Sequence, residues 1–298
     1  MSGFGDQFRA DGFGGLEITA PDFSGAQAAV LPVPYDAATS YISGTREGPR
    51  AILTASSQVE LFDAEWGLDY EKLRLATLNE VEQDVRGPEA MVNKLEKIYT
   101  ATMKKAGFVL MLGGDHSLST AAIRPLAKKY KKSLTVVQFD AHTDLRDQWQ
   151  GSPFSHACVM RRAVELAPIV QIGVRNISKA EWGFIKKSKH PVYPAWEIEG
   201  NNGWIDEMVE NLTEHVYITF DLDGMDPSVI PGVGTPEPGG MGWRQACAAI
   251  HAIGSRRKIV GADVMELRPL PPSVQSDFAA AKLAFRLLGA ALMMGPDK

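Results

Sequence analysis

Short apolar runs alternate with segments of helical period along nearly the whole chain, and this alternation constrains the fold more than any other feature. Strands joined through helices run parallel, and a parallel sheet needs helices on both faces. The chain of 298 residues has no linker rich in Gly, Ser or Pro and no repeat of fixed period. We therefore expect one α/β domain over residues 1–298, three layers with a mostly parallel sheet, preceded by an N-terminal extension at residues 1–25.

The apolar runs and the helical periods predict the individual elements. The predicted strands are Ala28–Val33, Leu73–Leu78, Phe108–Leu112, Leu134–Phe139, Ile169–Ile172, Val216–Phe220, Ile259–Met265 and a short one at Pro191–Tyr193. The predicted helices are Pro49–Ser56, Pro88–Lys105, Leu118–Tyr130, His156–Glu165, Ser178–Lys187, Asn202–Asn211, Trp243–Ile253 and Val274–Met293.

Composition excludes several classes of function. A net charge of -5 lacks the concentrated positive field that binds nucleic acid. Two cysteines make no disulfide framework, and residues 1–23 carry acidic residues where a signal peptide needs a basic start. The apolar segment Leu283–Met294 is interrupted by Arg286 and is shorter than the ~20 residues that cross a bilayer. We expect a cytoplasmic protein with neither nucleic acid nor membrane as partner.

Metal-binding side chains follow three of the predicted strands, at the point where each strand ends. In extended chain, a spacing of two residues places side chains on one face. Ligands bind outside the carboxyl ends of strands in open α/β sheets, so we expect the three clusters to converge. They are His116 after Phe108–Leu112, Asp140, His142 and Asp144 after Leu134–Phe139, and Asp221 and Asp223 after Val216–Phe220.

A site that gathers these six side chains needs positive charge. Four carboxylates and two imidazoles would repel and lose hydration unless cations neutralised them. Six side chains exceed one tetrahedral zinc, and carboxylate oxygens with a minority of imidazole favour Mn²⁺. With bridging carboxylates the set fits two ions about 3.5–4 Å apart that share a water. A lone Asp at a strand end is more often a cap or turn former, but the full set favours metal.

Five motifs resemble the ureohydrolase family, the arginases and agmatinases. They keep the family's order within a match from Pro34 to Glu266. The resemblance implies a three-layer domain with a parallel sheet of about eight strands. It also implies two Mn²⁺ per subunit, both bridged by Asp140 and Asp221, with His116 and Asp144 completing one ligand set and His142 and Asp223 the other. The motifs are Gly113–His116, Phe139–Asp144, Ser155–His156, Phe220–Pro227 and Gly234–Gly240.

The resemblance also implies a mechanism. A guanidinium is cationic and resonance-stabilised, so neutral water attacks it poorly, and a metal-bridging hydroxide is the expected nucleophile. His156 would be the proton shuttle to the leaving amine. Glu266 would pair with the guanidinium in a bidentate geometry. From the residues alone, His156 could instead face solvent at a helix start, and Glu266 could be a surface charge.

Within the family the chain is most like agmatinases. Arginases tend to show Arg-Asp-x-Asp where this chain reads Arg175-Asn176-Ile177-Ser178, so both acids that help to hold an amino acid end are missing. Ser40–Tyr41 and Gly44–Ile52 resemble the amino-terminal signature of agmatinases. Agmatine, hydrolysed to putrescine and urea in polyamine biosynthesis, is the expected substrate.

Other outcomes remain open at this point. The substrate could be another small cationic guanidino compound: guanidinobutyrate, guanidinopropionate, guanidine or arginine. A non-catalytic metal-binding homologue is the alternative from a different class. Relatives form trimers or hexamers, so the resemblance implies a homo-oligomer.

Overall fold

A parallel sheet runs through the middle of the molecule. The computed structural model describes residues 12–16, 23, 25–201 and 203–295. Within those residues, eight strands form one sheet in the order β4-β1-β5-β10-β9-β6-β7-β8, and every neighbouring pair is parallel. The strands are β1 (Ala28–Val33), β4 (Leu75–Thr77), β5 (Phe108–Gly113), β6 (Leu134–Phe139), β7 (Ile169–Ile172), β8 (Val192–Tyr193), β9 (His215–Asp221) and β10 (Lys258–Met265).

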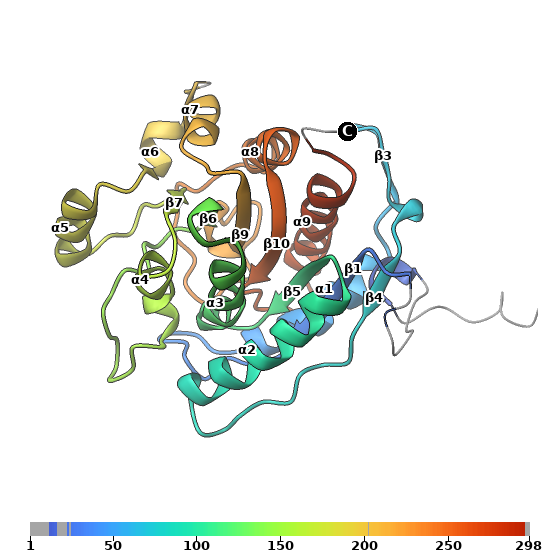
Figure 1. Cartoon of the computed structure of the whole chain (residues 1–298), viewed down its shortest axis with the longest axis horizontal. Coiled ribbons are helices and arrows are strands. Elements are labelled where there is room, and N and C mark those ends of the chain that lie inside the picture. The colour runs from blue at the N-terminus through green and yellow to red at the C-terminus, as the bar shows by residue number, and fades with distance from the viewer. Residues whose placement is uncertain (1–11, 17–22, 24, 202, 296–298) are drawn as a thin grey trace, which may run out of the picture.

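Helices cover both faces of this sheet, which confirms the predicted three-layer α/β/α class. Helices α2, α3 and α4 lie on one side, and α8 and α9 lie on the other (Figure 1). The helices are α1 (Gly48–Ser56), α2 (Pro88–Lys105), α3 (Ser119–Tyr130), α4 (Val159–Val164), α5 (Lys179–Ser188), α6 (Ala195–Ile198), α7 (Trp204–Glu210), α8 (Trp243–Arg256) and α9 (Gln275–Leu292).

Two hydrophobic cores lie against the two faces, because alternate residues of each strand point to opposite sides. Val30 and Leu110 pack in the core beneath α1, α8 and α9, whereas Leu31 and Val109 pack in the core beneath α2, α3 and α4. All six residues of β1 are buried. Burial on both faces explains why the strands appear in the sequence as continuous apolar runs.

Helix ends follow local sequence signals. α2 begins at Pro88, where proline at a first helical position costs no hydrogen bond. At the start of α5, Ser178 and Glu181 form a capping box. The predicted helix from His156 begins instead as a 3₁₀ turn and becomes α4 only at Val159. Position 202, where we expected a helix to begin, lies outside the described residues, and α7 begins at Trp204.

Three short elements were not predicted from the sequence. Strands β2 (Phe62–Asp63) and β3 (Leu68–Asp69) form a small antiparallel pair, and α6 is a single turn. Elements of two to four residues are too short to show a period. Most of the expected extension at residues 1–25 lies outside the described residues, but Phe13 is buried with its ring 4.6 Å from that of Phe285.

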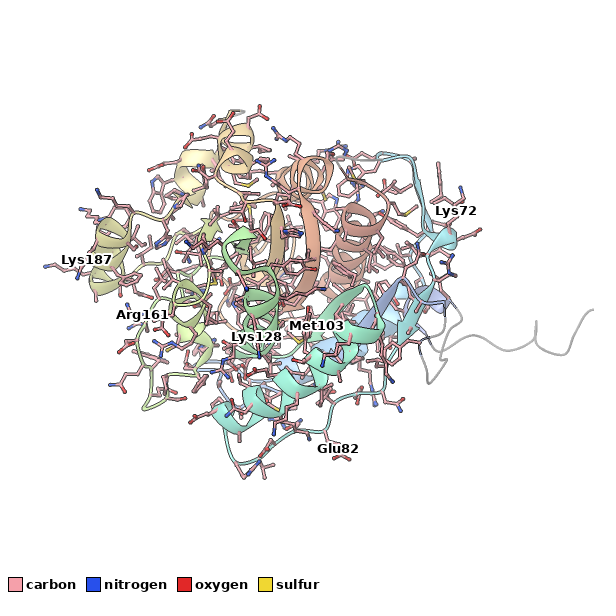
Figure 2. The ribbon with its side chains drawn as sticks, viewed as in Figure 1. Lys72, Glu82, Met103, Lys128, Arg161 and Lys187 are labelled. Atoms are coloured by element: carbon pink, nitrogen blue, oxygen red, sulfur yellow. The ribbon has the colours of Figure 1, made fainter. Side chains whose placement is uncertain are left out.

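Charged side chains lie mainly at the surface. Lys128 near the end of α3 is exposed, and Lys187 projects outward from α5 (Figure 2). Among the lysines and arginines that the structure describes, Arg286 is the exception, because it is 3% exposed within α9 and pairs with Asp63 at 2.6 Å. The apolar segment around it is thus a core helix. Across the described residues, every helix is too short or too polar to cross a membrane.

The order of strands places the polar motifs together. β5, β10, β9 and β6 are consecutive at the centre of the sheet, and all four run the same way. Their carboxyl ends therefore meet at one edge, as in other open α/β sheets that bind ligands there. His116, Glu266, Asp221 and Asp140 each lie within three residues of one of these ends.

Candidate metal centre

The six predicted metal ligands converge at this edge. The Nδ1 atom of His116 lies 3.1 Å from carboxylate oxygens of Asp140 and Asp144 and 3.2 Å from one of Asp221. The Nδ1 atom of His142 lies 3.0 Å from Asp223 and 3.5 Å from Asp140. Asp140 belongs to both groups, so they share a carboxylate.

The way in which these side chains converge differs from the prediction. They do not share the face of an extended strand, because β6 ends at Phe139 and Asp144 has a left-handed φ of 51°. Asp140 Oδ1 instead accepts a hydrogen bond of 2.6 Å from the backbone N–H two residues later. Asp221 Oδ1 does the same at 2.9 Å. Each aspartate is therefore both a turn former and a candidate ligand, with Oδ2 directed at His116.

The cluster is strongly negative and buried. Burial and the neighbouring Asp140 carboxylate raise the pKa of Asp144 to about 6. Burial, Asp223 and Asp140 raise the pKa of Asp221 well above its usual range. Burial lowers the pKa of His142, but Asp223 and Asp140 outweigh it and raise the pKa to about 12. The carboxylates thus favour positive charge between them, as a proton or as a metal ion.

A buried hydrogen-bond network fixes the orientation of His116. Its Nε2 lies 2.8 Å from the hydroxyl of Thr219, and that hydroxyl donates to Asp263 at 2.8 Å. Since the only O–H of Thr219 is donated to the Asp263 carboxylate, the Thr219 oxygen accepts a hydrogen bond from Nε2–H of His116. Tyr217 also donates to Asp263, at 2.5 Å. The Nδ1 atom of His116 is consequently the one turned towards the three aspartates.

The surroundings of this Nδ1 atom fit a metal ion. It is buried without a hydrogen-bond partner, yet three carboxylate oxygens lie within 3.2 Å. Neighbouring ligand atoms around an octahedral ion with bonds of about 2.1 Å lie about 3 Å apart. Carboxylate oxygens with one imidazole suit a hard divalent ion such as Mn²⁺. The residues present therefore fit the metal that the motifs imply.

The Thr219 network predicts a stability effect. Thr219→Val is expected to lower the free energy of unfolding of metal-free protein by about 1–3 kcal/mol, because it leaves His116 Nε2 and Asp263 short of a partner in the core. Denaturant unfolding measures it. Thr213→Val is the control for the loss of a threonine hydroxyl. Thr213 lies at the amino end of the sheet, where its hydroxyl bonds to that of Thr135. Equal stability of Thr219→Val and the wild type would contradict the network.

The two predicted catalytic residues lie beside the cluster and face each other. His156 Nδ1 is 3.5 Å from Glu266 Oε1, and their side chains are 15% and 5% exposed. The alternatives of a solvent-facing histidine and a surface glutamate are therefore wrong. Glu266 Oε1 also accepts a 2.8 Å hydrogen bond from the backbone of His116, and His156 Nε2 lies 2.9 Å from Ser40 Oγ.

His156 holds a proton in this setting. Burial lowers its pKa, but the Glu266 hydrogen bond and charge outweigh burial and raise the pKa to about 9. Both metal groups and His156 border one cavity of about 140 Å³. Arg146 and Trp149 also line it, and the Arg146 guanidinium lies 4.2 Å from the centroid of the Trp149 ring. A small substrate in this cavity would contact a proton donor on one side and the metal ligands on the other.

Arg175 supports the turn that carries Asp223. Its guanidinium donates to backbone carbonyls of Asp223 at 2.7 Å and of Glu237 at 2.6 Å, among others. It thereby joins the turn that carries Asp223 to the loop that carries Thr235, whose hydroxyl donates to Asp223 at 3.0 Å. Asn176, the next residue, borders the cavity.

The sequence analysis missed several supporting residues. Thr219, Asp263 and Gln138 are buried polar residues that contact the ligands or each other. Each stands within an otherwise apolar strand, which is the signal that could have identified them. A polar side chain is buried in such a place only when it has partners.

Comparisons with known proteins agree with the fold and the site. The model of the Arginase family matches residues 26–289. The chain is 38% identical to an N(1)-aminopropylagmatine ureohydrolase of Synechocystis sp. over 90% of both chains. It is 33% identical to an agmatinase of Pyrococcus horikoshii over 92% of this chain and 95% of the relative. The structure of the agmatine ureohydrolase of Thermoplasma volcanium superposes with a TM-score of 0.82, at 30% identity over 93% of this chain and 94% of the other. With the match spanning most of the chain, the chain belongs to the arginase family and is a hydrolase of that family.

Proposed function

We propose that this hydrolase removes urea from the guanidino end of agmatine, or of its N(1)-aminopropyl derivative, with two Mn²⁺ per subunit. The observation that carries the proposal is the pair of His/Asp groups that share Asp140. Membership of the arginase family supports the reaction class. The names of the Synechocystis and Pyrococcus relatives support the two substrates.

The ligand atoms divide into two sets. His116 and Asp144 would hold one ion and His142 and Asp223 the other, and Asp140 and Asp221 would serve both. Ions held there would lower the pKa of a bound water and so supply a nucleophile near neutral pH. Thr219 and Thr235 donate or accept hydrogen bonds that keep His116 and Asp223 in place.

The remaining chemistry comes from His156 and Glu266. The leaving amine needs a proton, and His156 holds one because Glu266 raises its pKa to about 9. Ser40 lies 2.9 Å from Nε2 of His156 and orients the ring. The Glu266 carboxylate would pair with the guanidinium and place its carbon over the two groups of ligands.

The mouth of the cavity supports a substrate without an amino acid end. Asn176 borders the cavity and is neutral, and its side chain donates to Glu237 at 3.1 Å. Position 176 therefore offers no carboxylate to hold an α-ammonium group. Agmatine and its aminopropyl derivative share the same guanidinobutyl end, so one site accepts both if the extra aminopropyl group reaches beyond the mouth.

A substrate panel tests the proposal. Full-length protein loaded with Mn²⁺ is incubated with agmatine, N(1)-aminopropylagmatine, arginine, guanidinobutyrate, guanidinopropionate and guanidine, and urea is measured. We expect kcat/KM for agmatine or its derivative to exceed that for arginine by at least about 10²-fold. Higher kcat/KM for arginine would contradict the substrate assignment. No urea from any of them would favour a non-catalytic metal-binding homologue.

Metal removal should lower thermal stability. Adding Mn²⁺ at 100 times its Kd to chelator-treated protein contributes about 2.7 kcal/mol per independent site. For a chain of this size, that raises Tm by about 5–10 °C. Differential scanning calorimetry of protein with chelator and with Mn²⁺ measures the shift, and Mg²⁺ at equal concentration is the control. An unchanged Tm with Mn²⁺ would argue against a metal centre in the buried carboxylate cluster.

A further inference from the structure

A row of buried amides leads from Asp140 into the sheet. Gln138 and Gln171 are register partners on the adjacent strands β6 and β7, and both are 0% exposed. Gln138 Nε2 donates to Asp140 Oδ2 at 2.6 Å. Gln171 Nε2 donates to Gln138 Oε1 and, at 2.7 Å, to the backbone carbonyl of Thr143. The outer end is His190, whose Nε2 lies 2.9 Å from Gln171 Oε1.

The direction of these hydrogen bonds is fixed from the inside. The Asp140 carboxylate only accepts, so Gln138 must turn its NH₂ group towards it and its oxygen outward. That oxygen needs a donor, which is the NH₂ group of Gln171, and the oxygen of Gln171 then faces His190. Burial lowers the pKa of His190 to about 4, so it is neutral at physiological pH and donates from Nε2–H.

The amides also have no evident role in holding the sheet together. Their neighbours on β6 and β7 are apolar, and β6 is paired by backbone hydrogen bonds on both sides. Replacing both partners of a buried hydrogen bond by apolar groups of similar shape is nearly neutral for stability. The two amides instead contact the candidate metal centre. Gln138 donates to the shared carboxylate of Asp140, and Gln171 donates to the backbone between His142 and Asp144.

We propose that Gln138 and Gln171 are positioning residues for the metal centre: Gln138 holds the Asp140 carboxylate so that its two oxygens face the two ligand groups, and Gln171 acts through Gln138. This inference rests on the proposed function, because it assigns the amides to the ligands of that function. Gln138 works by a charge-assisted hydrogen bond to Asp140, and Gln171 keeps the amide of Gln138 from rotating. Partners of this kind, behind the ligands, set how well a site binds its metal.

The test is a double-mutant cycle on Mn²⁺ affinity. Chelator-treated full-length wild type, Gln138→Met, Gln171→Met and the double variant are titrated with MnCl₂ in a calorimeter. Methionine keeps the unbranched shape but does not donate. We expect Gln138→Met to weaken binding about 10- to 100-fold and Gln171→Met to weaken it less. In the Gln138→Met background, Gln171→Met should weaken binding less than it does in the wild type, since its route to Asp140 is already cut and only its hydrogen bond to the Thr143 carbonyl is lost.

Thr135→Val is the matched control. Thr135 is a buried polar residue of β6, at the amino end of the strand, and bonds to Thr213 at 2.8 Å. It should change stability without changing Mn²⁺ affinity. If Gln138→Met does not fold, Gln138→Leu, which also cannot donate and adds no charge, should weaken binding to a similar extent.

The outcomes separate the inference from the proposed function. Wild type that binds no Mn²⁺ would overturn the metal centre itself. Wild type that binds Mn²⁺ while Gln138→Met binds it equally well would overturn only the role of the amides. If Gln171→Met lowered the Mn²⁺ affinity equally in the wild-type and Gln138→Met backgrounds, Gln171 would not act through Gln138. That result would overturn the role proposed for Gln171.

Discussion

Replacing Asp140 with asparagine is expected to remove both Mn²⁺ binding at normal affinity and nearly all urea release. Asp140 is fully buried and is the carboxylate common to the two ligand groups. Its loss therefore weakens both metal positions at once. Losing the charge stabilisation that such ions supply, about 4 kcal/mol, corresponds to a fall of about 10³-fold in kcat. Metal content by atomic emission and kcat from urea release measure the two effects.

Asp206→Asn makes the same chemical change elsewhere. Asp206 is exposed on α7 and pairs with Arg256 at 2.8 Å, and neither residue borders the cavity. It should leave metal content and kcat unchanged. Full metal content and full activity in Asp140→Asn would show that the ligand assignment is wrong, whatever the family membership implies.

Replacing His156 with glutamine is expected to lower kcat by about 10²- to 10⁴-fold while Mn²⁺ affinity stays normal. That range is the usual contribution of a positioned proton donor. His156 lies beside the ligand groups but faces Glu266 and Ser40, so its removal takes away a proton and no metal contact. Steady-state urea release and a calorimetric MnCl₂ titration measure the two quantities separately. A normal kcat would exclude His156 as the proton donor.

The proton on His156 can be followed directly in metal-free protein. Its pKa of about 9 lies above the usual 6.5, so the His156–Glu266 pair stabilises the fold fully below about pH 6.5, and this stabilisation is lost as the pH rises through about 9. Nuclear magnetic resonance of the imidazole should give that pKa. Glu266→Gln removes the charge and should lower it, whereas Ser40→Ala should change it little. A pKa unaffected by Glu266→Gln would show that the pair does not form.

Local patterns predicted the elements well because most of them carry their own signals. Strands β1, β6 and β7 and helix α2 begin and end where the apolar runs and the helical period indicate. The order of strands in the sheet could not be obtained in this way. Apolar periodicity shows that a strand is buried but not which strand lies beside it, so the place of β10 between β5 and β9 appears only in the structure.

The site was predictable in its members but not in its geometry. Spacing after apolar strands identified the aspartates and histidines, although turns rather than extended strands bring Asp140 and Asp144 together. Thr219 and Gln138 were missed because a single polar residue in an apolar run has no spacing to interpret. Their partners, Asp263 and Gln171, lie 44 and 33 residues away in the chain, and only the strand register makes each pair neighbours.

The central place of β10 has a consequence for how this protein is made. β10 is the last strand of the chain, yet it separates β5 from β9 in the sheet. A ribosome therefore releases the segments that carry His116, Asp140 and Asp221 long before residues 258–265 are available to bring them into register. Domains fold as units, so these ligands gather only when nearly the whole chain has emerged. Chains that stop before residue 258 lack β10 and Glu266, so we expect them not to assemble this site.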